Sequence, residues 1–187
     1  MEDYTNIDFS FIEQLEGVTL IGYVPEAHLS QSGVTIGAGF DIGQHSVVEL
    51  SKAFSSPLFN KLKPYAALKK MDAVIKLTAL PLTISTAEAH EIIRYSHSST
   101  IKRLANEWNA SCSRIPFEQL HCICATVMCS VAFQYGSLSK PTPKFWQQVT
   151  MDDWQGALSN LRHFGDNYST RRNKEADLLQ SWLEGLG

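Results

Sequence analysis

The chain has 187 residues, of which 44% are hydrophobic, and a formal net charge of −3 at neutral pH. This length and apolar content suffice for the core of an ordinary globular protein with one domain. The weakly acidic balance excludes the polybasic surface with which nucleic-acid-binding proteins neutralise phosphates. The N-terminal residues lack a basic segment followed by an apolar one, and no run of 18 apolar residues occurs. We therefore expect neither a signal peptide nor a membrane span.

The first predicted elements are a short helix and a β-hairpin. Ser10 and Glu13 have the spacing of a capping box, which predicts a helix that begins near Ser10 and ends at Gly17. Residues 18–24 and 33–40 are rich in β-branched and aromatic side chains and predict two strands joined by a longish loop. We expect these strands to form a small β lobe over about residues 17–44.

The segment SGVTIGAGFDIGQ, residues 32–44, combines strand-forming residues with several glycines. Strand alternation places Thr35, Gly37, Gly39 and Asp41 on one nearly bare face, against which a bulky ligand can lie. A straight strand would hold Thr35 and Asp41 about 20 Å apart, at about 3.3 Å per residue. We predict that Gly37, Gly39 and Gly43 bend the segment and bring these two side chains to one site.

From residue 45 onward helical periodicity predominates, which predicts a larger helical lobe over about residues 45–187, completed by the N-terminal helix. A second capping box, at Ser85 and Glu88, begins a long amphipathic helix. Residues 116–136 are apolar almost all round, with a proline at the start and a glycine at the end, and predict the central buried helix. Further helices are expected from Thr150, with Asp153 in the first turn, and over residues 169–183.

Four cysteines, Cys112, Cys122, Cys124 and Cys129, lie close together in the sequence. Their spacing lacks the paired C-x-x-C pattern of a zinc site, so we expect no metal. Small buried side chains in an apolar helix are the favoured interpretation, and a disulfide from Cys112 is the alternative.

Glu16 ends the first predicted helix, directly before the hairpin. A single glutamate at a helix end is usually a solvated side chain. The helix dipole disfavours a carboxylate at this end, however, and so favours the protonated form that a general acid needs.

The order of several motifs resembles that of the phage-type lysozyme family, and within it the pesticin-like lysozyme toxins. Members pair a helix that ends in Glu-Gly with a hairpin that carries T-I-G-x-G, here LEG at residues 15–17 and VTIGAGFD at residues 34–41. Further matches are ISTAEAHEIIRYSHSSTIKRL, VMCSVAFQYG, MDDWQGALSNL and TRRNKEADLL, in the family's order. The resemblance covers most of the chain and leaves mainly residues 45–80 unmatched.

The resemblance implies roles for the matching residues. Glu16 is the expected general acid, and Thr35 is expected to position the nucleophilic water or support the intermediate. Phage lysozymes carry an aspartate in the hairpin turn, where this sequence has only Glu26. The pesticin-like members instead place an aspartate six residues after the threonine, which matches Asp41. We expect Asp41 to be the second carboxylate, with Glu26 as the alternative.

Three more residues follow from the matched segments. Gln134, in the FQYG motif, is expected to contact the glycan in the cleft between the lobes, as is Glu26. Arg171 or Arg172 is expected to pair with Glu16. No cofactor and no metal are expected.

The resemblance implies an α+β lysozyme-like fold in a single domain over residues 1–187. It also implies a muramidase that cleaves the β-1,4 bond between N-acetylmuramic acid and N-acetylglucosamine in peptidoglycan. Without a signal peptide, the protein is expected to be a monomeric bacteriolytic effector, made in the cytoplasm and delivered by a secretion apparatus to the periplasm or cell wall of target cells. An immunity protein and peptidoglycan are the expected partners. The alternatives are a phage endolysin, chitinase or N-acetylglucosaminidase specificity, and an inactive glycan-binding module on the same fold.

Overall fold

The structure, a computed structural model, describes residues 5–26, 31–111 and 115–185. The chain divides into two compact units. One is Glu13–Ser96, and the other combines Met1–Ile12 with His97–Gly187. Helices α1 (Phe9–Glu16) and α5 (Thr86–Asn109) contribute residues to both units.

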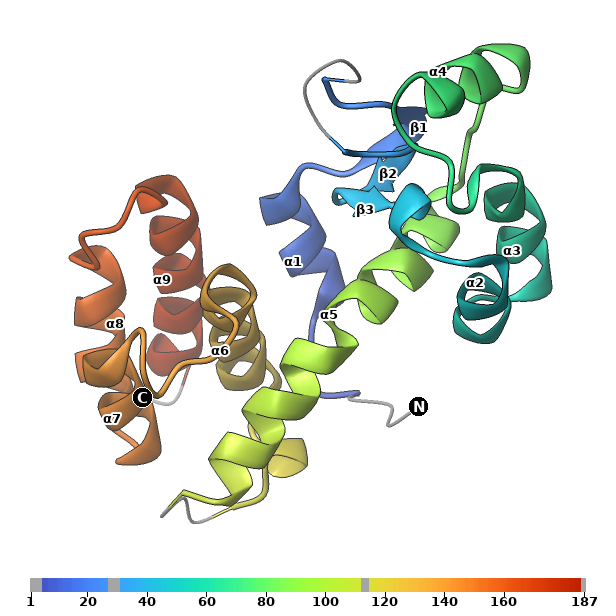
Figure 1. The fold of residues 1–187 in the computed structure, drawn as a ribbon. Coiled ribbons are helices and arrows are strands. Elements are labelled where there is room, and N and C mark those ends of the chain that lie inside the picture. Colours follow the sequence, from blue (N-terminus) through green and yellow to red (C-terminus); the bar gives the residue numbers. More distant parts are fainter. Residues whose placement is uncertain (1–4, 27–30, 112–114, 186–187) are drawn as a thin grey trace. The chain divides into compact units, whose positions relative to one another are not determined.

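The unit Glu13–Ser96 contains a three-stranded antiparallel sheet with the order β1-β2-β3 (Figure 1). The strands are β1 (Thr19–Tyr23), β2 (Thr35–Gly37) and β3 (Phe40–Asp41). Along the other edge of β1, the backbone of residues 82–84 adds two hydrogen bonds, from Gly22 N to Leu82 O at 2.9 Å and from Ile84 N to Leu20 O at 3.0 Å. Both edges of β1 are thus paired, which removes an exposed strand edge.

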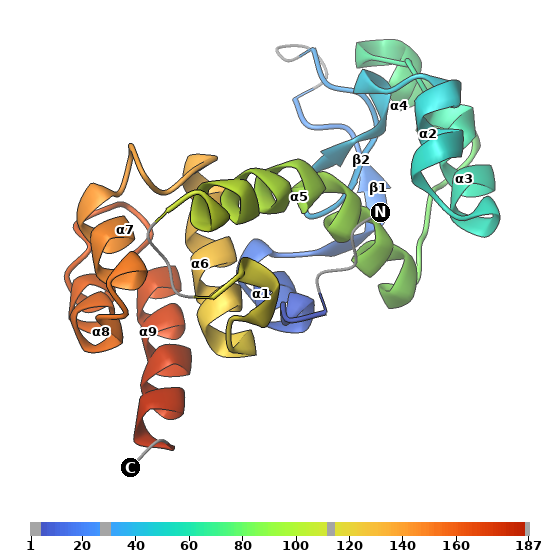
Figure 2. The same cartoon turned by 90° about the horizontal axis from the view of Figure 1, so that it is seen from below.

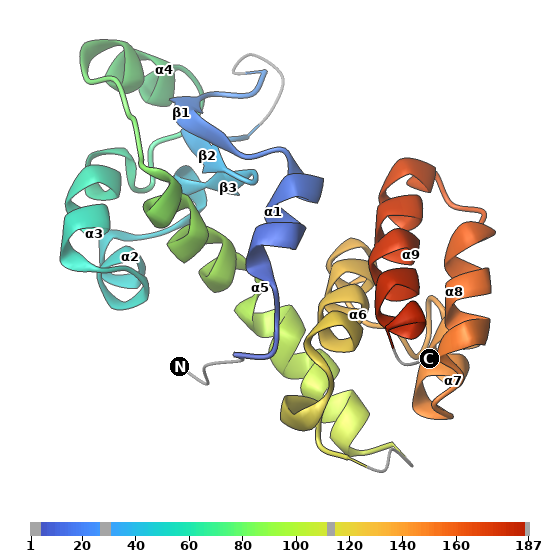
Figure 3. The ribbon, with the colours of Figure 1, turned by 180° about the vertical axis from the view of Figure 1, so that it is seen from behind.

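Short helices complete this unit, and Figure 3 shows them from behind. They are η1 (Ile42–Gln44), α2 (Val47–Ala53), α3 (Ser56–Leu62), η2 (Lys63–Tyr65), α4 (Lys70–Ala79) and the first part of α5. The core of the unit combines Val34 and Ile36 of the sheet region with Leu50, Leu58 and further apolar residues of the helices. All three residues of β2 are buried, so this strand lies in the core of the unit.

The other unit is helical. Its elements are η3 (Phe117–Gln119), α6 (Cys122–Tyr135), α7 (Pro143–Thr150), α8 (Trp154–Arg162) and α9 (Ser169–Glu184), with the second part of α5. Helix α9 packs against α6 and α8, and α8 packs against α7 (Figure 2). All residues from Cys124 to Ala132 are buried, so the prediction that α6 is the central buried helix is confirmed.

Two of the cysteines are buried as predicted. Cys124 and Cys129 lie in the apolar core around α6. Cys122, in the first turn of α6, is exposed, so the prediction that it is buried is wrong. Burial, assisted by the charge of Asp152, raises the pKa of the Cys124 thiol to about 12. Cys112 lies outside the described residues. The buried thiols therefore act as small apolar packing groups.

The capping residues of three helices differ from those predicted, and two of these helices begin several residues later than expected. Helix α1 is capped by Asp8, whose Oδ1 accepts hydrogen bonds from Ser10 N at 2.9 Å and Phe11 N at 3.1 Å, so Ser10 lies inside the helix. Helix α6 begins after His121, because residues 117–119 form a separate 3-10 turn. Thr150 ends α7, and α8 begins after Asp153, whose carboxylate accepts from Gly156 N at 2.8 Å. In each case a side-chain acceptor closer to the helix satisfies the first amides.

The capping box at Ser85 and Glu88 is confirmed. Ser85 N donates to Glu88 Oε2 at 2.7 Å, and Glu88 N donates to Ser85 Oγ at 3.3 Å. The α+β class is confirmed as well, with three strands and nine α-helices in the described part of the chain. Helices α2, α3 and α4 belong to the unit that carries the sheet, whereas the sequence assigned residues after 44 to a helical lobe. A single lysozyme-like domain over residues 1–187 stays a prediction.

Candidate active site

Thr35 and Asp41 lie side by side in the sheet. They are direct Cα partners in the antiparallel pairing of β2 with β3. The chain reverses between them because Gly37 and Gly39 adopt φ angles of 65° and 89°, a region that is costly for residues with a Cβ. Paired residues of antiparallel strands have Cα atoms about 4.5–5.5 Å apart and point to the same face. The predicted bend, and the juxtaposition of Thr35 with Asp41, are therefore confirmed.

The Asp41 carboxylate is held by three donors, two backbone amides and the side chain of Gln44. Its Oδ1 accepts hydrogen bonds from Gly33 N at 3.0 Å and Gly43 N at 2.9 Å, and its Oδ2 accepts from Gln44 Nε2 at 3.1 Å. Through Gly43 it also caps the short helix η1. An ionised carboxylate, which only accepts hydrogen bonds, matches this ring of donors. The geometry of Asp41 is thus fixed before any ligand arrives.

Gly33 and Gly43 cross at van der Waals contact under the carbonyl of Leu68, and we name these three residues the glycine crossing. A Cβ on Gly43 would lie 2.7 Å from the Gly33 Cα, and one on Gly33 would lie 2.6 Å from the Gly43 Cα. Either Cβ would also collide with the Leu68 carbonyl oxygen. Gly43 is not among the residues with positive φ. Its predicted role as a bend is therefore wrong, and close packing of backbone is what requires glycine there.

The predicted bare glycine face is only partly open. A Cβ on Gly37 would touch the Ile92 side chain of α5 at 3.4 Å, and Gly37 is buried. Gly39 is exposed, with open space where a Cβ would be. Helix α5 thus occupies the space at Gly37 that the sequence assigned to a ligand.

Glu16 is the last residue of α1 and lies in the same compact unit as Thr35 and Asp41. Gly17, with φ at 66°, ends the helix and turns the chain toward β1, as predicted (Figure 1). Three residues after Glu16, Thr19 pairs with Gly37, at the end of β2 next to the turn. The sheet register therefore ties the end of α1 to the strand that carries Thr35.

Glu26, the alternative second carboxylate, is exposed and has a φ of 42°. It precedes residues 27–30, which lie outside the described part of the chain. The catalytic roles of Glu16, Thr35, Asp41 and Glu26 stay predictions.

The contact between Glu13 and His90 was not predicted from the sequence. Glu13 lies one turn before Glu16 on α1, and its Oε2 contacts His90 Nε2 on α5. Both side chains belong to the sheet-bearing unit, and Glu13 is largely buried, with 12% of its side chain exposed. The last turn of α1 is thus anchored to α5. Glu13 was predicted as the carboxylate of a capping box with Ser10, and its contact with a residue of α5 has no local signal in the sequence.

Arg171 and Arg172 lie in a buried polar cluster of the helical unit. Arg172 Nε contacts Asp166 Oδ2 at 2.9 Å, and its Nη1 contacts Glu175. Arg171 Nε contacts Glu175 Oε1 at 3.3 Å and Ser130 Oγ on α6 at 3.2 Å. These bonds join α9 to α6. The predicted pairing of either arginine with Glu16 stays a prediction.

Opposing effects act on the carboxyls of this cluster. Burial raises the pKa of Glu175, and the two arginines and Ser130 oppose that shift only in part. Burial would also raise the pKa of Asp166, but hydrogen bonds from Arg172, Tyr135 and the Tyr168 amide outweigh it and lower the pKa. Arg172 additionally lies over the rings of Phe164, at 4.9 Å, and Tyr135, at 5.8 Å. The cluster is therefore a buried polar network in which the loss of one member would leave the others without a hydrogen-bond or charge partner.

Gln134 lies half-buried in the last turn of α6. Its predicted contact with a glycan is untested.

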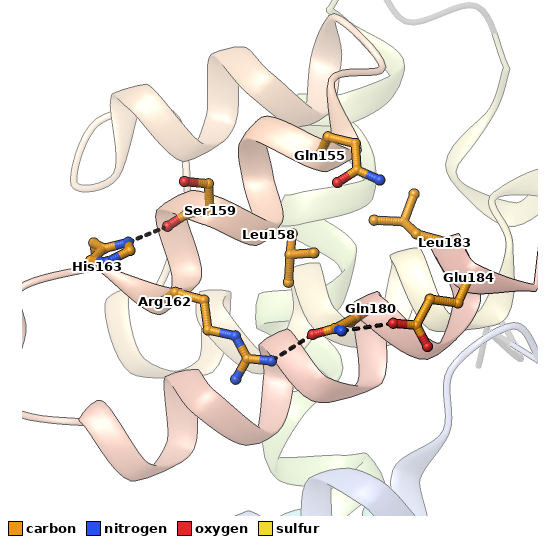
Figure 4. A pocket seen from close by; sticks show the side chains of 8 residues that line it. All are labelled: Gln155, Leu158, Ser159, Arg162, His163, Gln180, Leu183 and Glu184. Carbon is orange, nitrogen blue, oxygen red and sulfur yellow. Dashed lines mark hydrogen bonds between the residues drawn. The ribbon is translucent and has the colours of Figure 1, made fainter.

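An open groove with a volume of about 460 Å³ lies between α8 and α9. Figure 4 shows the side chains that line it. Its cationic side chain, Arg162, is already bound by Asp177 at 2.7 Å and Gln180 at 2.9 Å. None of the predicted site residues lines this groove. It therefore has no part in the candidate active site.

One family of known proteins matches this chain. A family model described as "Pesticin: Bacterial toxin homologue of phage lysozyme, C-term" matches residues 6–155, which is most of the chain. No curated protein matches the chain. In the part of the chain that the structure describes, no helix is long and apolar enough to cross a bilayer.

Proposed function

We propose that this chain, which belongs to the pesticin family of bacterial toxin homologues of phage lysozyme, is a muramidase. Its substrate is the β-1,4 bond between N-acetylmuramic acid and N-acetylglucosamine in peptidoglycan. The observation that carries the proposal is the family match over residues 6–155, which includes Glu16, Thr35 and Asp41.

The proposed chemistry needs one protonated carboxyl and one ionised carboxylate. Glu16 gives its proton to the leaving oxygen of the glycosidic bond. Asp41 stays ionised and faces the oxocarbenium-like centre or the attacking water. The three donors around Asp41 support this role because they hold the carboxylate in one orientation.

Thr35 fits a role in holding water. Its residue is only 4% exposed, and its hydroxyl lies 3.4 Å from the Gly33 carbonyl oxygen. So little exposed surface leaves no room for contact with a sugar ring, so we propose a water molecule as the partner of this hydroxyl. Gln134 and Glu26 are proposed to contact the glycan, and Arg171 or Arg172 to interact with Glu16.

The family's description as bacterial toxins favours an effector over a phage endolysin. We propose that the protein acts at the peptidoglycan of target cells after export from the cytoplasm. A producing cell would then need an immunity protein. The endolysin alternative uses the same chemistry and differs only in how the enzyme reaches the wall.

An inactive glycan-binding module is the second candidate. The hydrogen bonds of Asp41 to Gly33, Gly43 and Gln44 give this residue a structural role that needs no catalysis. This candidate predicts glycan binding without new reducing ends.

Purified protein is expected to clear suspensions of peptidoglycan, and Glu16→Gln is expected to remove at least about 10²-fold of this activity, the usual contribution of a general acid. The melting temperature should stay within about 2 °C of wild type, because Glu16 is a helix-terminal residue and not part of the core. Glu118→Gln, at an exposed glutamate of η3, is the matched control and should keep full activity.

Parallel variants decide the second carboxylate. Asp41→Asn should reduce turnover as strongly as Glu16→Gln, and Glu26→Gln should not. Mass spectrometry of the released muropeptides should find N-acetylmuramic acid at the reducing end, whereas N-acetylglucosamine there would indicate glucosaminidase specificity. A fully active Glu16→Gln enzyme would disprove the proposed mechanism.

A further inference from the structure

A chain of polar contacts lies behind Asp41 and ends at a lysine. Gln44 Nε2 donates to Asp41 Oδ2 at 3.1 Å and to the Gln31 carbonyl oxygen at 3.2 Å. The other end of the same amide, Gln44 Oε1, accepts from Lys69 Nζ at 2.9 Å. Asp41, Gln44 and Lys69 therefore form a continuous relay, which we name the Asp41 relay.

The direction of the Gln44 amide is determined by its neighbours. A flipped amide would place its oxygen against Asp41 Oδ2 and the Gln31 carbonyl oxygen, and its nitrogen against the Lys69 ammonium. Three acceptor–donor pairs would become repulsive contacts between like groups. Only one orientation satisfies all partners, so Gln44 presents a fixed N–H to Asp41.

The segment that carries Lys69 is also held in place. Ala67 N donates to the His45 carbonyl oxygen at 3.0 Å, and Lys70 N donates to the Ser32 carbonyl oxygen at 2.9 Å. Between them, Leu68 supplies the carbonyl of the glycine crossing. Ala67 and Lys70 adopt φ angles of 58° and 53°, which are costly for residues with a Cβ. Such strain persists only where the surroundings fix the backbone, and it concentrates at functional positions.

The acceptor count of Asp41 shows what the relay leaves open. A carboxylate has about four acceptor positions, two on each oxygen. Oδ1 uses both of its positions on Gly33 N and Gly43 N, and Oδ2 uses one on Gln44. Among the residues that the structure describes, no second donor reaches Oδ2, which leaves one position there for an O–H or N–H donor from a reactant.

We propose that Gln44 is a positioning residue for Asp41, that Lys69 strengthens its hydrogen bond by polarising the Gln44 amide, and that together they direct one Oδ2 acceptor position at the reacting water or sugar. This inference rests on the proposed function, in which Asp41 is the second carboxylate. Polarisation along a chain of hydrogen bonds is the physical basis of the Lys69 effect.

The central test replaces Gln44 in the full-length enzyme. Gln44→Met keeps the length of the side chain and removes the donor, so kcat should fall about tenfold to hundredfold, the range for a hydrogen bond to a charged group, with KM unchanged. Lys69→Met should lower kcat only about two- to fivefold, because the lysine is exposed. Lys63→Met is the matched control: Lys63 is exposed in the same unit and bonds to Asn60 at 3.0 Å, and its variant should keep wild-type kcat.

Two further measurements separate positioning from a merely structural role. In the Gln44→Met background, Lys69→Met should have no further effect on kcat, because the lysine acts through the amide. Gln44→Glu should be inactive near neutral pH, where two carboxylates face each other, and should regain activity as the pH falls and the new carboxyl becomes protonated and able to donate. Wild-type enzyme should lack this recovery.

The outcomes distinguish the inference from the function on which it rests. If Asp41→Asn retains wild-type kcat, Asp41 is not the second carboxylate. The proposed roles of Gln44 and Lys69 are then disproved together with that assignment. If Asp41→Asn is inactive while Gln44→Met and Lys69→Met equal the Lys63→Met control, only the relay is overturned. If Gln44→Met misfolds, the double-variant comparison is replaced by Gln44→Glu, whose lack of a pH-dependent recovery in a folded protein overturns the proposal equally.

Discussion

Gly43→Ala is expected to be far more destabilising than an ordinary glycine substitution in a loop. Its Cβ would lie 2.7 Å from the Gly33 Cα, and an ordinary carbon–carbon contact needs about 3.5–4.0 Å. The backbones must therefore separate by about 1 Å. Both neighbours are backbone atoms, of Gly33 and Leu68, so no side-chain rotamer can relieve the contact.

The structure sets the size of this effect. Overpacking costs about 1–3 kcal/mol, and backbone neighbours favour the upper end of that range. Separating these two backbone segments also stretches the hydrogen bonds from Gly33 N and Gly43 N to Asp41, each worth about 1.5–3 kcal/mol as bonds to a charged group. We expect a loss of at least about 3 kcal/mol, or about 6–12 °C in melting temperature for a chain of this size.

Gly39→Ala is the matched control. Gly39 has a φ of 89° but open space where the Cβ would be, so only the backbone conformation is costly, at about 1–2 kcal/mol. Urea denaturation followed by circular dichroism measures both variants, with the m-value checking that each unfolds in one transition. A Gly43→Ala protein that is no less stable than Gly39→Ala would refute the argument from the glycine crossing.

Two further predictions concern the buried cluster of the helical unit. Arg172→Met should cost about 3–5 kcal/mol in urea denaturation, because it leaves Glu175 and Asp166 each with one partner fewer; a variant as stable as wild type would contradict this. Asp166→Asn should destabilise the protein at pH 7, and the deficit should shrink as the pH falls below about 4, because the folded-state pKa of Asp166 is lowered and the stability due to its ionised form is lost on protonation. Melting curves of wild type and variant from pH 7 to pH 3 check the sign, and a deficit that is constant over this range would show that the carboxylate charge is not responsible.

Much of the secondary structure follows from local signals in the sequence. The capping box at Ser85 and Glu88, the end of α1 at Gly17 and the apolar composition of α6 each rest on groups within a few residues of one another. Where local signals compete, the prediction failed: Ser10 and Thr150 both looked like helix starts, but Asp8 and Asp153 supply the capping carboxylates. A carboxylate is as good an N-cap as a hydroxyl, and the pattern alone could not rank them.

The candidate site shows the same division. Its glycines predicted a bend, and the sequence order of Thr35 and Asp41 then allowed their pairing. The sequence did not predict the relay through Gln44 to Lys69, because Lys69 is 25 positions away from Gln44 and its loop gives no periodic signal. Contacts at that separation depend on the path of the whole chain.

The α+β class, the family resemblance and the residue types of the candidate site could be predicted without a structure, because periodicity, capping and motif order are local properties of the chain. The different roles of the glycines are visible in the folded chain alone: Gly37 and Gly39 turn the chain, whereas Gly33 and Gly43 let two backbones meet beneath Leu68. The folded chain also surrounds Asp41 with donors from Gly33, Gly43 and Gln44. A φ preference is encoded residue by residue, whereas the close approach of distant backbone segments, and the hydrogen bonds it permits, exist only after the chain has folded.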